Sequence, residues 1–555
     1  MSNSELLFVP LGGVGEIGMN LALYGYGPPE DRAWIMVDCG VTFPDAALPG
    51  VDLVMADISF ADELGDALKG IVITHAHEDH YGAVLALWPK LRKPVWMSPF
   101  TAGMLEAKGR DEPGMVGEVP LHIYKAGGRF TIPPFEIEAI HVTHSIPEPL
   151  SLAIKTPFGR VIHTGDWKID AEPSLGADTD AATFRRLGDE GVLALICDST
   201  NAMRDGHSPT ETAVSESLAE IIAKAEGRVA ITTFSSNVGR IRSIAQAAKK
   251  AGRRCMLMGR SIRRVAEVAD GLGYMEGLDE FVEEDEFQSI DRAKIVIILT
   301  GSQGEDRAAL SKLARNEHPR VHLSAGDTVI YSSRVIPGNE KPILETENRL
   351  VDMGVDIITD SDALVHVSGH PRRDELRQMY EWVRPEIAVP VHGEAQHLNA
   401  HARLAGEMNV AQVVPIRNGD MLRLAPGPAE IVDEVPHGRI YKDGVIVGDE
   451  EAVGVRQRRK LSYAGLVACS IVLDAKGRMA DDVDLSLHGL PVENAAGEPF
   501  DDLIYDAAVG AVESIPLKRR KDDGVVTAAI EKAIRAAARD HWGKKPVVTV
   551  FLARV

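Results

Sequence analysis

The feature that most constrains this chain is a dense group of metal-binding side chains directly after an apolar strand. Residues 70–74 read Gly-Ile-Val-Ile-Thr, and the next six residues are His-Ala-His-Glu-Asp-His. Imidazole nitrogen and carboxylate oxygen are ligands that zinc accepts where thiolates are absent. An ordinary polar loop is the alternative interpretation, but the density of the run favours a metal site with four candidate ligands, His75, His77, Asp79 and His80.

Three later strand ends offer the further ligands that a pair of metal ions would need. Strand ends suit this role because rigid elements hold metal geometry best. A single histidine such as His392 is more often structural, and His141 and His163 are interpreted as structural groups or as groups that support a ligand. The candidates are His144 after residues 137–142, Asp166 after residues 160–163 and His392 after residues 387–391.

Cysteine and apolar patterns predict a soluble, cytoplasmic protein. The four cysteines lie far apart and form no Cys-x-x-Cys pair, which fits a reducing compartment better than a disulfide framework or a thiolate metal site. The N-terminus has no basic region ahead of an apolar stretch, and no apolar run reaches the roughly 18 residues that span a bilayer. We therefore expect no membrane association.

The net charge argues against a globally basic surface for nucleic acid. Lysine and arginine number 60 and aspartate and glutamate 82, which gives a formal charge of −22 at pH 7. Action on nucleic acid would require local positive charge, and for each basic run a solvated charged face is an equal alternative. The candidate runs are Arg253, Arg254, Arg260, Arg263 and Arg264, and residues 518–521.

A glycine-rich segment near the N-terminus imitates a dinucleotide-binding fingerprint. Residues 13–18 read Gly-Val-Gly-Glu-Ile-Gly after an apolar strand, and Asp38 follows about twenty residues later. The fingerprint requires a helix after the glycines, whereas residues 20–33 contain two glycines and two prolines that would break one. We expect a strand, a turn and a second strand, and no nucleotide cofactor.

More than two hundred residues separate Asp166 from His392, which predicts a large inserted domain. Amphipathic helices alternate there with apolar strands, as in a parallel α/β domain. The helices are expected at residues 211–225 and 237–251, and the strands at residues 229–233, 255–258 and 294–299. The last part of the chain predicts a compact α+β domain with strands at residues 465–473 and 547–552 and helices at residues 501–514 and 525–542.

The order of the candidate ligands resembles the metallo-β-lactamase superfamily. A His-x-His-x-Asp-His run, a later histidine, a Gly-Asp dipeptide and a terminal histidine follow one another in the same order. The resemblance implies two Zn²⁺ ions per chain, with Mn²⁺ as an alternative activating metal. By that resemblance one ion is bound by His75, His77 and His144, the other by Asp79, His80 and His392, and Asp166 is shared by both.

Three landmarks resemble motifs A, B and C of the β-CASP group of nucleic-acid-cutting enzymes. They are Cys197-Asp198-Ser-Thr, Val367-Ser368-Gly369-His370 and Val391-His392. The histidine of motif C resembles the RNA-acting branch, because the DNA-acting branch tends to carry valine there. Segments 12–20, 234–237 and 333–339 are similar to the ribonuclease J family of bacteria, and the similarity covers essentially the whole chain.

One departure from that family is Pro371-Arg372-Arg373, where many relatives carry small residues. The details of the terminal-phosphate pocket therefore do not carry over from the resemblance. A more basic pocket is one expectation.

The resemblance implies an α/β fold class: a metallo-β-lactamase αββα sandwich with an inserted parallel α/β (β-CASP) domain and a small α+β C-terminal domain. The C-terminal domain is expected to support a homodimer or a higher homo-oligomer. The expected boundaries are residues 1–208 and 361–425 for the metallo-β-lactamase domain, 209–360 for the insert, 426–454 for a linker and 455–555 for the C-terminal domain.

The activity implied by the resemblance is hydrolysis of RNA phosphodiesters, chiefly in the 5′-to-3′ direction from 5′-monophosphate ends. Endonuclease activity is a second expectation. Asp79 and Asp166 would orient the attacking hydroxide. His370, held by Asp198, would contact the scissile phosphate and protonate the leaving 3′ oxygen.

Residues 235–237 follow a strand and open a helix, where free backbone N–H groups attract anions, although an ordinary helix cap is an equal alternative. Residues 301–304 repeat that placement, and Arg240 would either donate to phosphate or lie on a wet helix face. The candidate RNA contacts are Ser235, Ser236, Asn237, His366, Val367, Ser368, Gly369 and His370.

Two other functions fit part of the pattern. A small-molecule hydrolase of the same fold would use the same ligands, but the insert and motifs A to C argue against it. A catalytically silent RNA-binding subunit is the second alternative, and the presence of all seven expected ligands argues against that.

Overall fold

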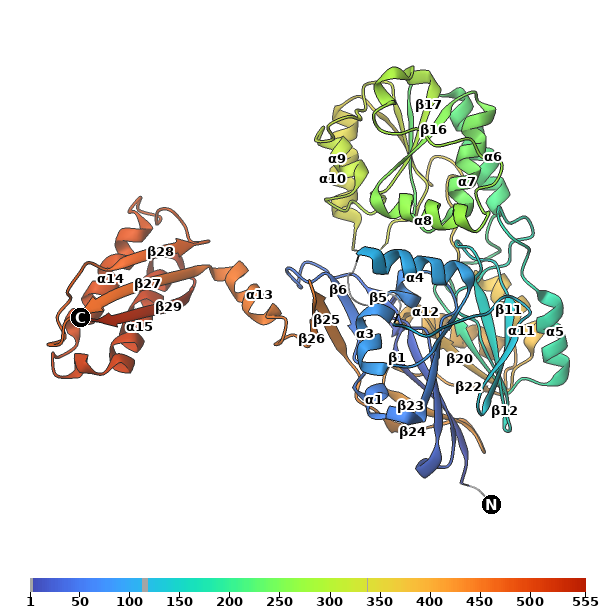
Figure 1. Ribbon diagram of the computed structural model, residues 1–555, viewed down its shortest axis with the longest axis horizontal. Helices are drawn as coiled ribbons and strands as arrows, with labels where there is room; N and C mark the ends of the chain where they lie inside the picture. The colour runs from blue at the N-terminus through green and yellow to red at the C-terminus, as the bar shows by residue number, and fades with distance from the viewer. Residues whose placement is uncertain (1–2, 112–117, 337) are drawn as a thin grey trace. The chain divides into compact units, whose positions relative to one another are not determined.

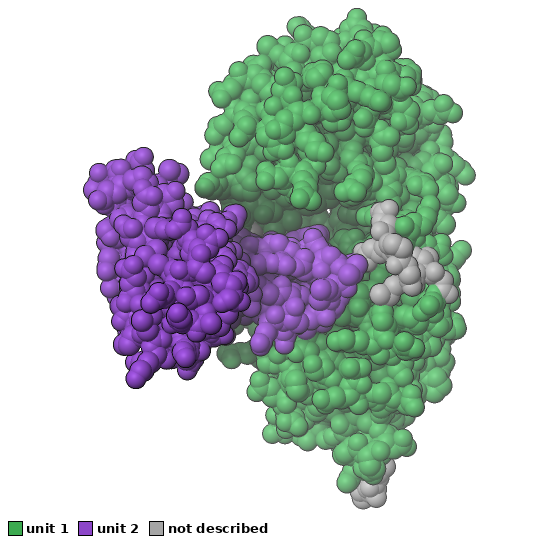
Figure 2. All heavy atoms as spheres, turned by 60° about the vertical axis from the view of Figure 1, so that its left-hand side comes forward, with its two compact units in different colours: residues 1–42, 55–439 green, residues 43–54, 440–555 purple. Residues whose placement is uncertain are grey.

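The computed structural model describes residues 3–111, 118–336 and 338–555, so Pro337 of the segment 333–339 lies outside the described residues. The chain divides into two compact units, coloured separately in Figure 2. Unit 1 comprises Met1–Thr42 and Met55–Arg439, and unit 2 comprises Phe43–Val54 and Ile440–Val555.

Unit 1 contains two large sheets. The first has eight strands in the order β24 (Glu430–Glu434), β23 (Asp420–Ala425), β1 (Glu5–Gly12), β3 (Leu21–Gly27), β4 (Ala33–Val37), β7 (Leu68–Val72), β8 (Val95–Met97) and β9 (Leu121–Ile123). The second has seven in the order β10 (Arg129–Ile132), β11 (Phe135–His141), β12 (Leu150–Thr156), β13 (Gly159–His163), β14 (Ala194–Asp198), β20 (Ile387–Val391) and β22 (Gln412–Val413).

The two sheets pack face to face through one apolar core. Phe8 and Tyr24 of the first sheet belong to the same buried cluster as Leu152 and Ile196 of the second. This arrangement follows from the sequence because strands such as β11 alternate buried and more exposed residues, which gives each sheet an apolar face.

Helices cover the outer faces of both sheets. A second core cluster joins β13 and β14 to α5 (Ala181–Glu190), α11 (Arg373–Val383) and α12 (Ala395–Glu407). On the first sheet, Phe60 of α1 (Ser59–Glu63) packs edge-on against Trp34 of β4. The layers are therefore helix, sheet, sheet and helix, and the expected αββα sandwich is confirmed.

The insert is a parallel sheet with helices on both sides (Figure 1). Its strands lie in the order β16 (Arg254–Met258), β17 (Ile295–Leu299), β15 (Val229–Thr232), β18 (Thr328–Tyr331) and β19 (Asp356–Ile358). The two predicted helices are present as α6 (Glu211–Lys224) and α7 (Val238–Lys250). The predicted parallel α/β insert is confirmed, whereas β18 and β19 went unpredicted because they are short and lack a long apolar run.

The glycine-rich segment forms the expected strand, turn and strand. β1 is followed by the two-residue β2 (Val14–Gly15) and then by β3, which pairs with β1 in antiparallel fashion. Gly13 has a φ of 84°, and a Cβ atom at this position would collide with Oδ1 of Asn20. Glycine is required there because the backbone passes directly against the Asn20 side chain.

Unit 2 contains the sheet β28 (Asp484–His488), β27 (Leu466–Leu473) and β29 (Val547–Arg554). One face packs against α14 (Phe500–Ser514) and α15 (Asp523–Trp542) through residues such as Ile471, Ile504 and Ile530. The predicted strands and helices are present, and β28 is an additional strand. The domain expectation placed residues 43–54 with the first domain, whereas they cluster with unit 2, where the Asp52 N–H donates to the Lys442 carbonyl at 2.8 Å.

Within the described residues, no helix has the length and apolar character needed to cross a membrane.

Candidate metal centre

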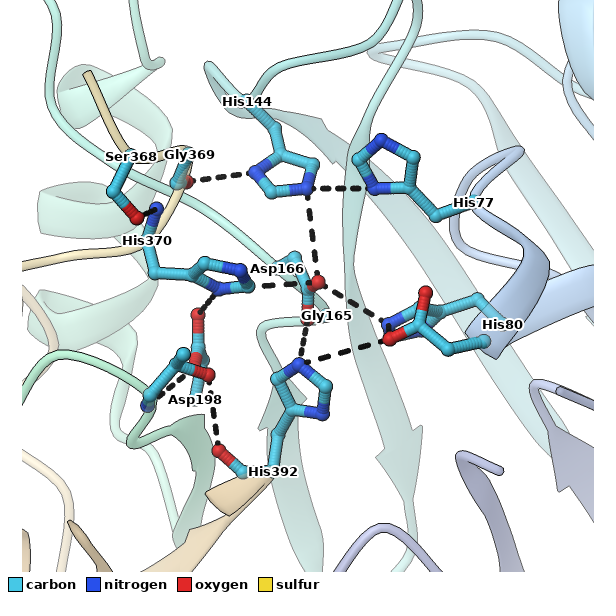
Figure 3. A network of polar contacts seen from close by, with 12 residues as sticks. His77, His80, His144, Gly165, Asp166, Asp198, Ser368, Gly369, His370 and His392 are labelled. Atoms are coloured by element: carbon cyan, nitrogen blue, oxygen red, sulfur yellow. Dashed lines mark hydrogen bonds and ion pairs between the residues drawn. The ribbon is translucent and has the colours of Figure 1, made fainter. Parts of the chain in front are cut away.

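The predicted ligands meet where the strands of both sheets end. His75 follows β7, and the short helix α2 (Glu78–Tyr81) begins after His77 and carries Asp79 and His80. From the second sheet, His144 follows β11, Asp166 follows β13, and His392 follows β20. Figure 3 shows the rings of His80, His144 and His392 directed toward Asp166 in the centre, with the His77 ring beside that of His144.

The first group consists of His75, His77, His144 and Asp166. Nδ1 of His77 lies 3.1 Å from Nε2 of His75 and 2.9 Å from Nε2 of His144. Oδ2 of Asp166 lies 3.8 Å from Nε2 of His75 and 3.6 Å from Nε2 of His144.

The second group consists of Asp79, His80, Asp166 and His392. Nε2 of His80 lies 3.2 Å from Oδ2 of Asp166 and 3.6 Å from Oδ2 of Asp79. Nε2 of His392 lies 3.5 Å from Oδ1 of Asp166. Asp166 therefore faces both groups, one carboxylate shared between two sets of imidazoles.

The chemistry of this donor set fits metal ions. The ligand atoms of each group lie within 4.8 Å of one another, and atoms bound tetrahedrally to one zinc at about 2.0 Å would be roughly 3.3 Å apart. Oδ1 of Asp166 is buried and accepts no hydrogen bond from the described residues. Ring nitrogens that face one another, beside a buried carboxylate oxygen without a donor, are explained by cations between them.

Burial sets the charge state of the first group. Burial, and then the neighbouring His80, lowers the pKa of His75 well below its ordinary value. Burial lowers the pKa of His77 to about 4, and burial together with His77 lowers that of His144. These imidazoles are neutral at pH 7, which is the form that binds a metal.

The second group is more strongly acidic in composition. Although burial opposes charge, Asp166, Asp79 and Asp38 raise the pKa of His80. His392 and His80 in turn hold the pKa of Asp166 well below its ordinary value despite burial. A cation bound here would take over the role of the His80 proton.

Two residues that the sequence analysis did not identify orient ligands of the second group. Oδ2 of Asp38 lies 2.7 Å from Nδ1 of His80, and Oδ1 of Asn20 lies 2.8 Å from Nδ1 of His392. These contacts direct Nε2 of each ring toward Asp166, as carboxylate and amide partners of metal-binding histidines commonly do. The only related signal in the sequence was the glycine segment before Asn20, where Gly13 permits a close approach to that side chain, and it did not indicate the contact with His392.

His392 itself has a left-handed backbone, with a φ of 51°. This conformation is costly for a residue with a Cβ atom and is typical of positions where function fixes the geometry. The strained turn directs the ring back into the site from the end of β20.

His370 and Asp198 form a pair beside the two groups. Nδ1 of His370 lies 2.8 Å from Oδ2 of the buried Asp198, whose other oxygen, Oδ1, accepts from the backbone N–H and the hydroxyl of Thr200. Burial opposes the charged imidazolium, but Asp198 and then Asp166 raise the pKa of His370 to about 9. With Nδ1 engaged, Nε2 is the nitrogen that can serve chemistry.

The segment around His370 is tied to the first group. Nδ1 of His144 lies 2.7 Å from the Gly369 carbonyl, which requires an N–H at that nitrogen and leaves Nε2 as a lone-pair donor. A Cβ atom on Gly369 would collide with the His144 ring, so glycine is required for this approach. Oγ of Ser368 accepts from Nδ2 of Asn201 at 2.8 Å.

The structure brings together the two segments that hold the candidate RNA contacts, residues 235–237 and residues 366–370. Phe234 directly precedes Ser235, and the centroid of its ring lies 6.3 Å from the centroid of the His366 ring. Ser235 and Ser236 lie between β15 and α7 and are half-buried, whereas Val367 is buried. Asn237 caps α7 by accepting from the Arg240 N–H at 2.9 Å, so its side chain is engaged in the helix cap.

Several basic and turn residues have roles other than phosphate binding. Arg240 is buried and pairs with Oε2 of Glu211 at 2.7 Å, so neither of its expected positions applies. Residues 301–304 form a turn and open no helix, because α9 (Ala309–Ala314) begins later. Arg254 and Arg263 form ion pairs with glutamates, as ordinary surface charges do.

The fold and its clustered imidazoles and carboxylates define a hydrolase of the metallo-β-lactamase type. Family models agree. Residues 29–220 match the metallo-beta-lactamase superfamily, 226–350 the beta-CASP domain of ribonuclease J, 354–415 a Zn-dependent metallo-hydrolase RNA specificity domain, and 453–555 the ribonuclease J C-terminal domain.

Full-length relatives give the family. Ribonuclease J of Sinorhizobium meliloti is 61% identical over 553 residues, which cover 100% of this chain and 98% of that protein. Ribonuclease J of Mycolicibacterium smegmatis is 36% identical, with coverages of 97% and 95%, and ribonuclease J2 of Bacillus subtilis is 35% identical, with coverages of 100% and 99%. The chain belongs to the ribonuclease J family.

A solved protein of unknown function from Enterococcus faecalis V583 shares the fold. It is 13% identical, with a TM-score of 0.51, over 76% of this chain and 100% of that one.

Proposed function

We propose that this metal-dependent ribonuclease degrades RNA chiefly from the 5′ end, with a preference for a 5′-monophosphate, and also cuts internally. The observation that carries the proposal is the His370–Asp198 pair next to two ligand groups that share Asp166. A phosphodiester enzyme requires both a donor for the leaving oxygen and neutralisation of the phosphate's charge, and this arrangement supplies the two side by side.

Different residues of the chain perform different parts of the reaction. Asp79 and Asp166 accept hydrogen bonds from the attacking water and orient it toward phosphorus. His370 keeps one ring N–H on Asp198 and donates the proton at Nε2 to the departing 3′ oxygen, so that the products carry 5′-phosphate. Bound metal ions lower the pKa of water and neutralise the charge that develops on the phosphate.

We assign two Zn²⁺ ions to the site, one to each ligand group, with Mn²⁺ as an alternative metal. The neutral imidazoles of the first group favour zinc. Ser235, Ser236, His366, Ser368 and Gly369 are the proposed contacts to the RNA phosphates. The half-buried hydroxyls at the start of α7, adjacent to the segment of His366, support this assignment.

The experiment uses RNAs of one sequence that carry 5′-monophosphate, 5′-triphosphate or 5′-hydroxyl ends and are labelled at the 5′ nucleotide. Protein of measured metal content should release labelled mononucleotide chiefly from the monophosphate RNA. Short labelled fragments from all three RNAs would contradict the preference for a 5′-monophosphate end and would indicate that the enzyme cuts RNA internally. If none of the three RNAs is cleaved, the assignment of ribonuclease activity is contradicted.

We also propose self-association through the C-terminal domain. In unit 2, α14 and α15 cover one face of the sheet and leave the other open, with Phe551 of β29 60% exposed on it. Contact of this face with another subunit would remove the apolar surface of Phe551 from water, which supports the proposal.

A further inference from the structure

Three arginines gather beside the catalytic pair, and we call them the arginine cluster: Arg204, Arg334 and Arg372. Arg372 lies two residues after His370, at the start of α11, and the backbone N–H of Arg373 donates to the Arg204 carbonyl at 2.9 Å. Arg334 follows β18 of the insert and donates to Oδ1 of Asn201 at 3.1 Å. The cluster therefore joins residues from both domains of unit 1.

Within the part of the chain that the structure describes, the three positive charges have no carboxylate in ion-pair contact. Among the described residues, no carboxylate forms an ion pair with any of the three guanidinium groups, and Nε of Arg372 is buried without an acceptor. The neighbouring Arg373, in contrast, pairs with Asp205 and Glu407, each at 3.3 Å. In a chain of formal charge −22, this local excess of positive charge stands out.

The guanidinium groups repel one another. Burial, and then Arg372, lowers the pKa of Arg204, while burial, Arg204 and Arg372 lower that of Arg334. Asp360 acts in the opposite direction on both. Like charges held together cost free energy that an anion bound among them would recover.

The cluster adjoins the residues that act on RNA. Nδ2 of Asn201 donates to Oγ of Ser368 at 2.8 Å and to the His370 carbonyl at 3.1 Å, while its Oδ1 accepts from Arg334. An anion at the cluster would thus lie one side chain away from the catalytic histidine.

We propose that the arginine cluster is a phosphate-binding subsite for RNA next to the catalytic centre. Guanidinium groups bind phosphate oxygens in bidentate fashion, and three of them can hold more than one phosphate. The proposal rests on RNA being the substrate. The phosphates come either from the 5′ terminus or from the backbone of the strand, and the test distinguishes the two.

The test compares Arg372→Gln with Arg373→Gln, which removes the same charge one residue away but from an arginine that is already paired. Binding of a hydrolysis-resistant 2′-O-methyl RNA is measured by fluorescence anisotropy at several salt concentrations. Arg372→Gln should weaken binding roughly tenfold and lower the slope of log Kd against log salt by about 0.7. Arg204→Gln, which changes a largely exposed side chain, should act in the same direction.

Equal losses for 5′-monophosphate and 5′-hydroxyl RNA would assign the cluster to backbone phosphates, and a loss for the monophosphate RNA alone would assign it to the terminus. If Arg372→Gln and Arg204→Gln both bind like Arg373→Gln, with an unchanged salt slope, the subsite is refuted. This binding result is independent of cleavage polarity, so a failure of the subsite and a failure of the proposed function are distinguishable.

Discussion

At the residue scale, the protonation of His370 depends mainly on one neighbouring carboxylate, that of Asp198. The buried carboxylate of Asp198 contacts Nδ1 at 2.8 Å and is the largest favourable influence on the raised pKa of His370. A histidine that donates a proton must carry it at working pH, so activity should fall as the pH rises through the pKa of His370.

Asp198→Asn tests this dependence. The amide keeps the shape and removes the charge, so the pKa of His370 should fall and the alkaline limb of the kcat profile should move about one pH unit or more to lower pH. The measurement is kcat against pH, with metal content determined for both proteins. A limb that stays in place, in a variant that retains its metals, would remove His370 as the proton donor.

The grouping of the candidate ligands could be predicted from the sequence, because they come directly after apolar strands and are of residue types that bind metal. Asn20 and Asp38 could not be predicted in these roles. Their function depends on chain segments that meet from far apart, as when Asn20 contacts His392 across 372 residues of sequence. The arginine cluster was indicated only in part, through the unusual Arg372, because Arg204 and Arg334 lie in distant loops.

At the element scale, a buried ionic network connects the start of α6 and α7 to the loop that carries Asp166. Lys168 lies 2.7 Å from Oδ2 of Asp170 and 3.7 Å from Oε1 of Glu211, and Arg240 binds the other Glu211 oxygen. Despite burial, Arg240 and Lys168 lower the pKa of Glu211. Its ionised form therefore stabilises the fold above the ordinary glutamate pKa, and this contribution is lost as the pH falls toward the lowered value.

Glu211→Gln should destabilise the insert, because it leaves buried positive charges without compensation, at a cost of about 3–5 kcal/mol. Since residues 209–360 contain no tryptophan, hydrogen exchange of α6 and α7 is the suitable measurement. The matched control is Glu220→Gln in the same helix, whose side chain is 71% exposed beside Lys224. Equal protection in both variants would contradict a structural role for the network.

The elements that were predicted correctly carry strong periodic patterns. The buried strands of the insert are continuous apolar runs, and the glycine segment was distinguished from a nucleotide-binding turn by the helix-breaking residues after it. The strands that were missed, such as β19 with only three residues, contain too few positions to show a period.

At the scale of the whole molecule, the open sheet face of unit 2 predicts an assembly. Phe551 lies beside Ser470 on β27, on the face opposite α14 and α15. The boundary of this unit was beyond sequence analysis, because residues 43–54 join it through contacts with residues about four hundred positions away, such as that between Asp52 and Lys442.

Phe551→Asp should reduce the oligomer size measured by light scattering during gel filtration, because a buried charge would oppose the contact. Val492→Asp is the control, since Val492 is 85% exposed in a loop of the same unit. A wild-type protein that is already monomeric, or an oligomer unaffected by Phe551→Asp, would refute this interface.

The position of His392 at the far end of the insert has a consequence for the cell that makes this enzyme. Three of the four candidate ligands of the second group, Asp79, His80 and Asp166, lie before residue 167. The fourth is His392, whose hydrogen-bond partner Asn20 lies near the N-terminus. A growing polypeptide that still emerges from the ribosome therefore lacks a complete centre until the insert has been synthesised.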